Sequence, residues 1–141
     1  METKRDFYVE MNKRRRELLA TDEGYNNCAS TALYLVGEIG ADNYLPREIA
    51  EVIIDDLKED DKPALGNLLI FEDVCKNLAH LAVVVQENPL KLTSRNGEWK
   101  PIIKSQSYEK ICELYSNIGA YPAKFLVPSK LQKILEMEAQ Q

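Results

Sequence analysis

Hydrophobic and polar positions follow two different periods along the chain. Before Pro63, apolar side chains recur every three or four positions, a spacing typical of helices that bury one face. After Pro63, short segments rich in β-branched residues stand between turn-forming residues, a pattern typical of strands. This order predicts helices first and an antiparallel sheet second, which is the α+β class rather than alternating α/β.

The pattern of apolar residues in the first forty positions predicts two helices. One covers residues 2–20, and the next covers residues 28–39, with Asn27 as a good N-cap and Gly40 as the residue that ends the helix. One face of the second helix carries Cys28, Ala32, Leu35, Val36 and Ile39.

A third helix is expected to begin at Pro46, a residue that suits the first turn, and to end in the acidic stretch 55–61. That stretch lacks the ligand spacing of a calcium loop, so it is interpreted as a solvated helix end. The side chains expected to face the core are Ile49, Val52, Ile53 and Leu57.

The second part of the chain predicts most of the sheet. Strands are expected at residues 67–71, 80–85, 90–95, 100–104 and 123–127, and helices at residues 108–118 and 129–139. We expect a single domain over residues 1–141, made of an N-terminal helix (1–23), a core of helix and sheet (24–104) and a C-terminal extension (105–141).

Charge narrows the classes of function. Asp and Glu number 23 against 18 Lys and Arg, and the resulting net charge of −5 disfavours a general nucleic-acid binder or a binder of anionic membranes. The basic run Lys13-Arg14-Arg15-Arg16 is interpreted as the solvated face of the first helix. The alternative is that this run docks a protein partner.

Cysteine and histidine usage limits the metal and redox chemistry. The three cysteines, Cys28, Cys75 and Cys112, are odd in number and far apart, unlike the dense spacing of a secreted disulfide scaffold. With a single histidine and no CxxC pair, neither a metal site nor another cofactor is expected. The charged start does not look like a signal peptide and no apolar run is long enough to cross a bilayer, so we expect a cytoplasmic protein.

The candidates for chemistry are Cys28 and His80. Cys28 begins a predicted helix, where unpaired backbone N–H groups and the helix dipole favour a thiolate, so a depressed pKa is expected. His80 heads a strand that is apolar on both faces, and a thiolate near an imidazole is the minimal machinery for attack on a carbonyl. The alternative is that Cys28 is an ordinary small core residue and that His80 simply caps its strand.

The order of elements around these two residues adds a family resemblance. A helix opens with Tyr25-Asn26-Asn27-Cys28-Ala29-Ser30, a strand follows with Gly66-Asn67-Leu68-Leu69-Ile70-Phe71, and the next strand reads His80-Leu81-Ala82-Val83-Val84-Val85. Over residues 24–100 this order resembles the NlpC-like and CHAP (cysteine, histidine-dependent amidohydrolase/peptidase) families of papain-like cysteine hydrolases. The chain has Asn27-Cys28-Ala29-Ser30 where many members have Asp-Cys-Ser-Gly, Gly66-Asn67 where they have Gly-Asp, and no second histidine.

The resemblance implies a papain-like fold, with N-terminal helices and a nucleophile helix packed on an antiparallel sheet of about four to six strands. It implies a cysteine amidohydrolase or peptidase in which Cys28 attacks an amide carbonyl and His80 moves the proton to the leaving amine. The Cys28 backbone N–H would bind the oxyanion, together with Tyr25 or Asn27. Peptidoglycan peptides are the usual family substrate, and a cytoplasmic amide or peptide substrate is equally open. The alternative is a non-catalytic binding or assembly module on the same fold.

A third residue is needed to orient His80. If residues 87–89 form a three-residue hairpin loop, the register sets Gln86 opposite Leu90 and His80 opposite Asn96, whose amide can then accept the imidazole N–H. Ser94, on the same face of the strand, is the second candidate. A four-residue loop would instead set Arg95 opposite His80, and Asn96-Gly97 is also a common turn dipeptide.

Overall fold

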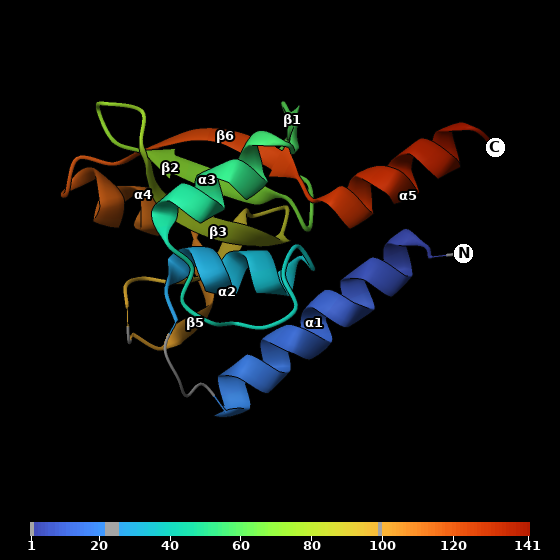
Figure 1. Ribbon diagram of the computed structural model, residues 1–141, viewed down its shortest axis with the longest axis horizontal. Coiled ribbons are helices and arrows are strands. Elements are labelled where there is room, and N and C mark those ends of the chain that lie inside the picture. Colours follow the sequence, from blue (N-terminus) through green and yellow to red (C-terminus); the bar gives the residue numbers. More distant parts are fainter. Residues whose placement is uncertain (1, 22–25, 99) are drawn as a thin grey trace.

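Helices cover an antiparallel sheet in the computed structural model, which describes residues 2–21, 26–98 and 100–141 (Figure 1). The helices formed by these residues are α1 (Lys4–Thr21), α2 (Cys28–Leu35), α3 (Arg47–Asp55), α4 (Tyr108–Ser116) and α5 (Ser129–Ala139). The strands are β1 (Lys58–Asp60), β2 (Leu68–Glu72), β3 (Leu78–Gln86), β4 (Lys91–Arg95), β5 (Ile102–Ser107) and β6 (Tyr121–Val127). The arrangement confirms the predicted α+β class and the antiparallel sheet.

The strands lie in the order β1-β6-β2-β3-β4-β5, and every neighbouring pair is antiparallel. The interior strand β3 carries His80 and contacts α2, which begins at Cys28. β6 comes from the last part of the chain but lies between β1 and β2. The predicted placement of a helix that begins at Cys28 against a central strand with His80 is therefore confirmed.

The hairpin between β3 and β4 follows the predicted register over part of its length. The paired residues in that register are Val83 with Thr93 and Val84 with Leu92. A bulge then shifts the ladder, and Gln86 pairs with Lys91 rather than with Leu90 as expected. The loop therefore spans residues 87–90, and the bulge compensates for its extra residue.

Successive residues of β3 face two different hydrophobic layers. Leu81 and Val83 belong to a layer that also contains buried side chains of α1, α2, α3 and α5. Ala82 and Val84 belong to the opposite layer, which contains buried side chains of α4. Because side chains alternate along a strand, His80 faces the α4 layer, whereas α2 packs on the other face.

Helix α2 ends earlier than predicted. The sequence pattern extends the helix to residue 39 with Gly40 as its end, but the structure ends it at Leu35 with Val36 as C-cap. The reason is Gly37, which adopts the left-handed conformation (φ 84°) directly after the cap. The segment after Gly37 is therefore free to turn back towards α2.

The face that α3 presents to the core was predicted only in part. Ile53 and Leu57 pack against the core as expected, but Ile49 and Val52 are 50% and 64% exposed. The fully buried positions are Ala50 and Ile54. Ala50 and Ile54 are four positions apart and therefore form a narrow buried stripe along α3. The small side chain of Ala50 lets the helix approach the core.

The interpretation of residues 55–61 as a helix end was wrong for their second half. Lys58, Glu59 and Asp60 form β1, which pairs with Val127, Leu126 and Phe125 of β6. Lys58 and Glu59 are exposed at the edge of the sheet, whereas the partly buried Asp60 accepts a hydrogen bond from Asn67 Nδ2 at 3.0 Å. Charges on an edge strand disfavour pairing with another molecule.

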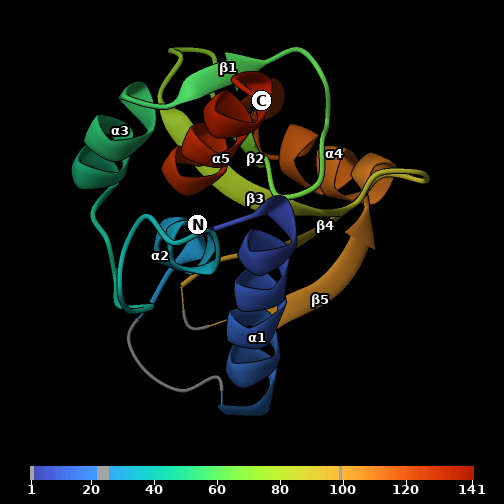
Figure 2. The ribbon, with the colours of Figure 1, turned by 90° about the vertical axis from the view of Figure 1, so that its right-hand side faces the viewer.

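The basic run on α1 is only partly the solvated face that we predicted. Arg14 donates to the carbonyl oxygen of Tyr34 at 2.6 Å and lies over its ring, and Arg15 donates to the carbonyl oxygen of Lys104 at 2.9 Å. These two arginines therefore attach α1 to the segments that carry α2 and β5 (Figure 2).

None of the helices in the described part of the chain has the length and apolar character needed to cross a membrane.

Candidate functional site

The thiol of Cys28 lies at a surface cleft of about 300 Å³. The cleft is bounded by the first turn of α2, the segment before α3, the start of β3 and the turn after β4. Its lining residues are Asn27, Cys28, Ala29, Tyr44, Leu45, Arg47, Leu78, Ala79, Gly97 and Glu98. The start of the predicted nucleophile helix thus faces a cleft large enough for part of a small ligand.

Burial raises the pKa of the Cys28 thiol, so the expectation of a depressed pKa is wrong. Hydrogen bonding from the backbone of Leu81, Ala29 and Cys28 itself opposes this effect but is the smaller influence, and the carboxylate of Glu98 raises the pKa further. The helix N-terminus therefore supplies backbone donors, as predicted, without producing a resting thiolate. The sequence pattern does not show how deeply the neighbouring segments of the fold bury the Cys28 thiol.

The imidazole of His80 is buried among aromatic rings. It is 1% exposed, and its ring lies 4.0 Å from the ring of Tyr115 in a stacked arrangement and 5.6 Å from the ring of Phe71. Neither ring nitrogen has a hydrogen-bond partner among the described residues. Burial lowers the pKa of His80 to about 3, so the ring is neutral at physiological pH.

The Cys28 thiol lies beside the backbone of β3 next to His80, but the two side chains do not form a hydrogen bond. Hydrogen bonding from the backbone of Leu81, the residue after His80, reaches the Cys28 sulfur, whereas the imidazole turns towards α4. The described β3–β4 ladder begins at Val83, so it does not include His80, and α2 contacts both strands. A negative charge on Cys28 also raises the pKa of Tyr115, although burial is the larger cause.

Asn96 does not accept a hydrogen bond from His80. Its Oδ1 instead accepts from Ser94 Oγ at 2.7 Å and from the Tyr115 hydroxyl at 3.3 Å. The second candidate, Ser94, also accepts from Gln106 Nε2 at 2.8 Å. Asn96 is therefore close to the aromatic rings around His80, because Tyr115 contacts both Asn96 and the imidazole. Nothing in the sequence pattern singles out Tyr115, which is 35 positions after His80 in a helix of ordinary composition.

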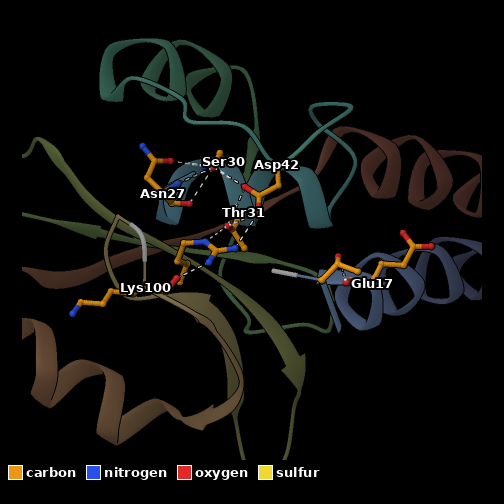
Figure 3. Close-up of polar contacts among 8 residues, drawn as sticks. Glu17, Asn27, Ser30, Thr31, Asp42 and Lys100 are labelled. Atoms are coloured by element: carbon orange, nitrogen blue, oxygen red, sulfur yellow. Dashed lines mark hydrogen bonds and ion pairs between the residues drawn. The ribbon is translucent and has the colours of Figure 1, made fainter. Parts of the chain in front are cut away.

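The two candidates for oxyanion binding have different outcomes. Asn27 is the N-cap of α2, and its side chain accepts from the Ser30 backbone N–H at 2.9 Å (Figure 3). The same side chain donates to the Leu45 carbonyl at 2.8 Å. Asn27 lines the cleft, and its side-chain amide caps the start of the helix. Tyr25 lies outside the described residues.

A buried ion pair under α2 was not predicted. The guanidinium of Arg95, 1% exposed, donates to Asp42 Oδ2 at 3.1 Å and to Thr31 Oγ1 at 2.8 Å. Asp42 also accepts from Ser30 Oγ at 2.7 Å, so the pair joins β4 and the segment after α2 to the helix (Figure 3). The available signal was the position of Arg95 at the end of a buried strand, but its partner lies 53 residues away.

Comparison with known proteins gives no family for this chain: no family model, no curated protein and no solved structure matches it significantly.

Proposed function

We propose that this protein is a cysteine-dependent amidohydrolase or peptidase with a papain-like arrangement, in which Cys28 is the nucleophile and His80 the general base and acid. The observation that supports the proposal is the position of the Cys28 thiol at the first turn of a capped helix, at a cleft and directly beside the backbone that follows His80. The resemblance to NlpC-like and CHAP hydrolases points to the same two residues.

The proposed reaction starts from a neutral pair, because burial raises the pKa of Cys28 and lowers that of His80. The sulfur attacks the amide carbon while its proton passes to an imidazole nitrogen, and the C–N bond breaks as His80 returns that proton to the leaving amine. Water then attacks the thioester, releasing the acid and restoring the thiol. Backbone N–H groups of the first turn of α2 are the donors for the oxyanion.

This reaction requires the Cys28 sulfur and an imidazole nitrogen to approach each other when a substrate fills the cleft, while the imidazole stays stacked on the Tyr115 ring. Both orphaned ring nitrogens favour such a movement, since no hydrogen bond of His80 to a described residue has to be broken. Proton transfer that is coupled to attack does not need a preformed thiolate–imidazolium pair.

The test is release of amine from a mixture of synthetic di- and tripeptide amides, measured with an amine-reactive fluorophore. We expect the wild type to release amine, Cys28→Ser to release none, and Cys112→Ser, which changes a thiol on α4, to behave as the wild type. Amine release that persists in Cys28→Ser, or absence of release by the wild type, contradicts the proposal.

The second candidate is a non-catalytic binding or assembly module on the same fold. The burial of His80 without a polar partner favours it, because a base with a pKa of about 3 has little affinity for a proton. This candidate predicts that His80→Leu leaves the iodoacetamide alkylation rate of Cys28 unchanged and that no peptide amide is hydrolysed. Slower alkylation of Cys28 in His80→Leu contradicts it.

A further inference from the structure

No residue that the structure describes forms a hydrogen bond with the His80 imidazole, so the orientation of the ring depends on ring contacts. The closest of these is Tyr115, whose ring centroid lies 4.0 Å from that of the imidazole with an angle of 17° between the planes. Phe71 is farther away and tilted, at 5.6 Å and 54°. The plane in which the imidazole lies is therefore set mainly by Tyr115.

Tyr115 is itself held at both ends. Its ring packs against Phe71 at 5.3 Å within the layer beneath α4, and its hydroxyl donates to Asn96 Oδ1 at 3.3 Å. Asn96 is fixed in turn by Ser94, which donates to it from β4. A chain of contacts thus runs from the turn after β4 through Tyr115 to the face of the imidazole.

We propose that Tyr115 is the positioning residue for His80, and that Asn96 acts on the imidazole through the Tyr115 hydroxyl rather than by a direct hydrogen bond. The inference rests on the proposed function, in which His80 moves a proton. The stacked ring fixes the plane of the neutral imidazole. The face of an aromatic ring also attracts a cation, so Tyr115 stabilises the imidazolium that forms when the thiol proton is transferred.

The arrangement gives Ser94 and Asn96 a role near His80, although neither of them forms a hydrogen bond with its imidazole. Gln106 of β5 donates to Ser94, which donates to Asn96, and Asn96 accepts from Tyr115. All three side chains are fully or partly buried. Their common effect is to hold the Tyr115 hydroxyl, and with it the ring that covers the imidazole.

The test uses the imidazole as its own reporter, because the chain contains one histidine. The ring protons of His80 are followed by NMR in the full chain. We expect a displacement of their shifts by the stacked ring in the wild type, its loss in Tyr115→Leu, and an equal partial loss in Tyr115→Phe and Asn96→Ala. The double variant Tyr115→Phe/Asn96→Ala should show no further change, since both substitutions break the same hydrogen bond.

Tyr108→Phe is the matched control, since it removes a hydroxyl on the same helix whose hydrogen-bond partner is Cys112. It should leave the His80 signals as in the wild type. The proposal is overturned if Tyr115→Phe and Asn96→Ala leave the signals unchanged. It is also overturned if Asn96→Ala still alters them in the Tyr115→Phe background, or if Tyr108→Phe alters them equally.

Amine release separates this inference from the proposed function. If the wild type hydrolyses peptide amides, Tyr115→Phe should lower kcat and leave KM unchanged, because the cleft itself is not altered. If the wild type hydrolyses none while the NMR results are as expected, the hydrolase proposal fails and Tyr115 still positions His80. Unchanged kcat in Tyr115→Phe overturns the positioning role in an active enzyme.

Discussion

At the scale of single residues, burial of the His80 imidazole without a hydrogen bond makes the stability of the fold depend on pH. Its pKa is about 3 in the folded chain and close to 6.5 in the unfolded chain. As pH falls below 6.5, the unfolded chain binds a proton that the folded chain does not bind. The contribution of His80 to the free energy of unfolding is therefore fully present above pH 6.5. It is lost progressively as the pH falls to about 3.

The first prediction concerns this loss. Between pH 7 and pH 5, the wild type should lose about 2 kcal/mol of unfolding free energy through His80 alone. The variant His80→Leu should lack this contribution, and urea unfolding of both proteins at the two pH values measures the difference. Equal losses in the two proteins would show that the imidazole takes up its proton in the folded state as well.

The sequence placed Cys28 and His80 on the correct elements but could not give the direction of the imidazole. β3 is apolar on both faces, so the alternation of hydrophobic and polar residues that normally tells one face from the other is missing. The direction of the pKa shift of Cys28 could not be predicted either. The sequence indicates the helix N-terminus, which lowers the pKa, but it does not indicate the burial of the thiol, which raises it.

At the scale of elements, the start of α2 depends on one side chain. Asn27 satisfies the backbone N–H of Ser30 and also donates to the carbonyl of Leu45, so it joins the helix to the segment before α3. The Ser30 hydroxyl accepts in return from the Asn27 backbone N–H, which completes a capping box. The position of Cys28 relative to the cleft follows from this cap.

The second prediction tests the cap. Asn27→Ala should lower the free energy of unfolding by about 1–2 kcal/mol, because it removes the N-cap acceptor. Asn27→Asp keeps an acceptor for the Ser30 N–H and should recover most of that loss, although it cannot donate to Leu45. Urea unfolding at pH 7 measures both variants, and equal destabilisation by Ala and Asp would assign the effect to the Leu45 contact instead.

The elements themselves were mostly visible in the pattern of hydrophobic positions. The predicted helix at residues 129–139 has the same bounds as α5, and the strands at 67–71 and 80–85 match β2 and β3 to within two residues at each end. β1 was missed because its residues are charged and its partner, β6, lies more than sixty positions later. No local period can show such a pairing.

At the scale of the whole molecule, the two terminal helices lie together against one face of the sheet (Figure 1). Phe7 of α1 and Leu131 of α5 both reach Gly66, which precedes β2 and has a positive φ of 87°. A Cβ at Gly66 would lie 2.8 Å from Phe7 Cε1. The absence of a side chain here lets α1 and α5 approach the sheet.

The third prediction follows from this close approach. Gly66→Ala should lower the unfolding free energy by about 2–4 kcal/mol, from the strained backbone conformation and the contact with Phe7. Gly40→Ala is the control, since no heavy atom lies within 4 Å of the added Cβ and its φ is not positive. Thermal unfolding compares the variants, and equal melting temperatures for both would mean that α1 moves aside at little cost.

The position of β6 between β1 and β2 also has a consequence for folding during synthesis. β1 pairs only with β6 in the described ladders, and one side of β2 is completed by the same strand. When only the first hundred residues have emerged from the ribosome, β6 has not been made. The edges of β1 and β2 that pair with β6 are therefore unpaired. Addition of β6 to the sheet is a late step that pairs residues far apart in the sequence. Until then, the partly synthesised chain exposes a strand edge that a chaperone or another nascent chain can bind.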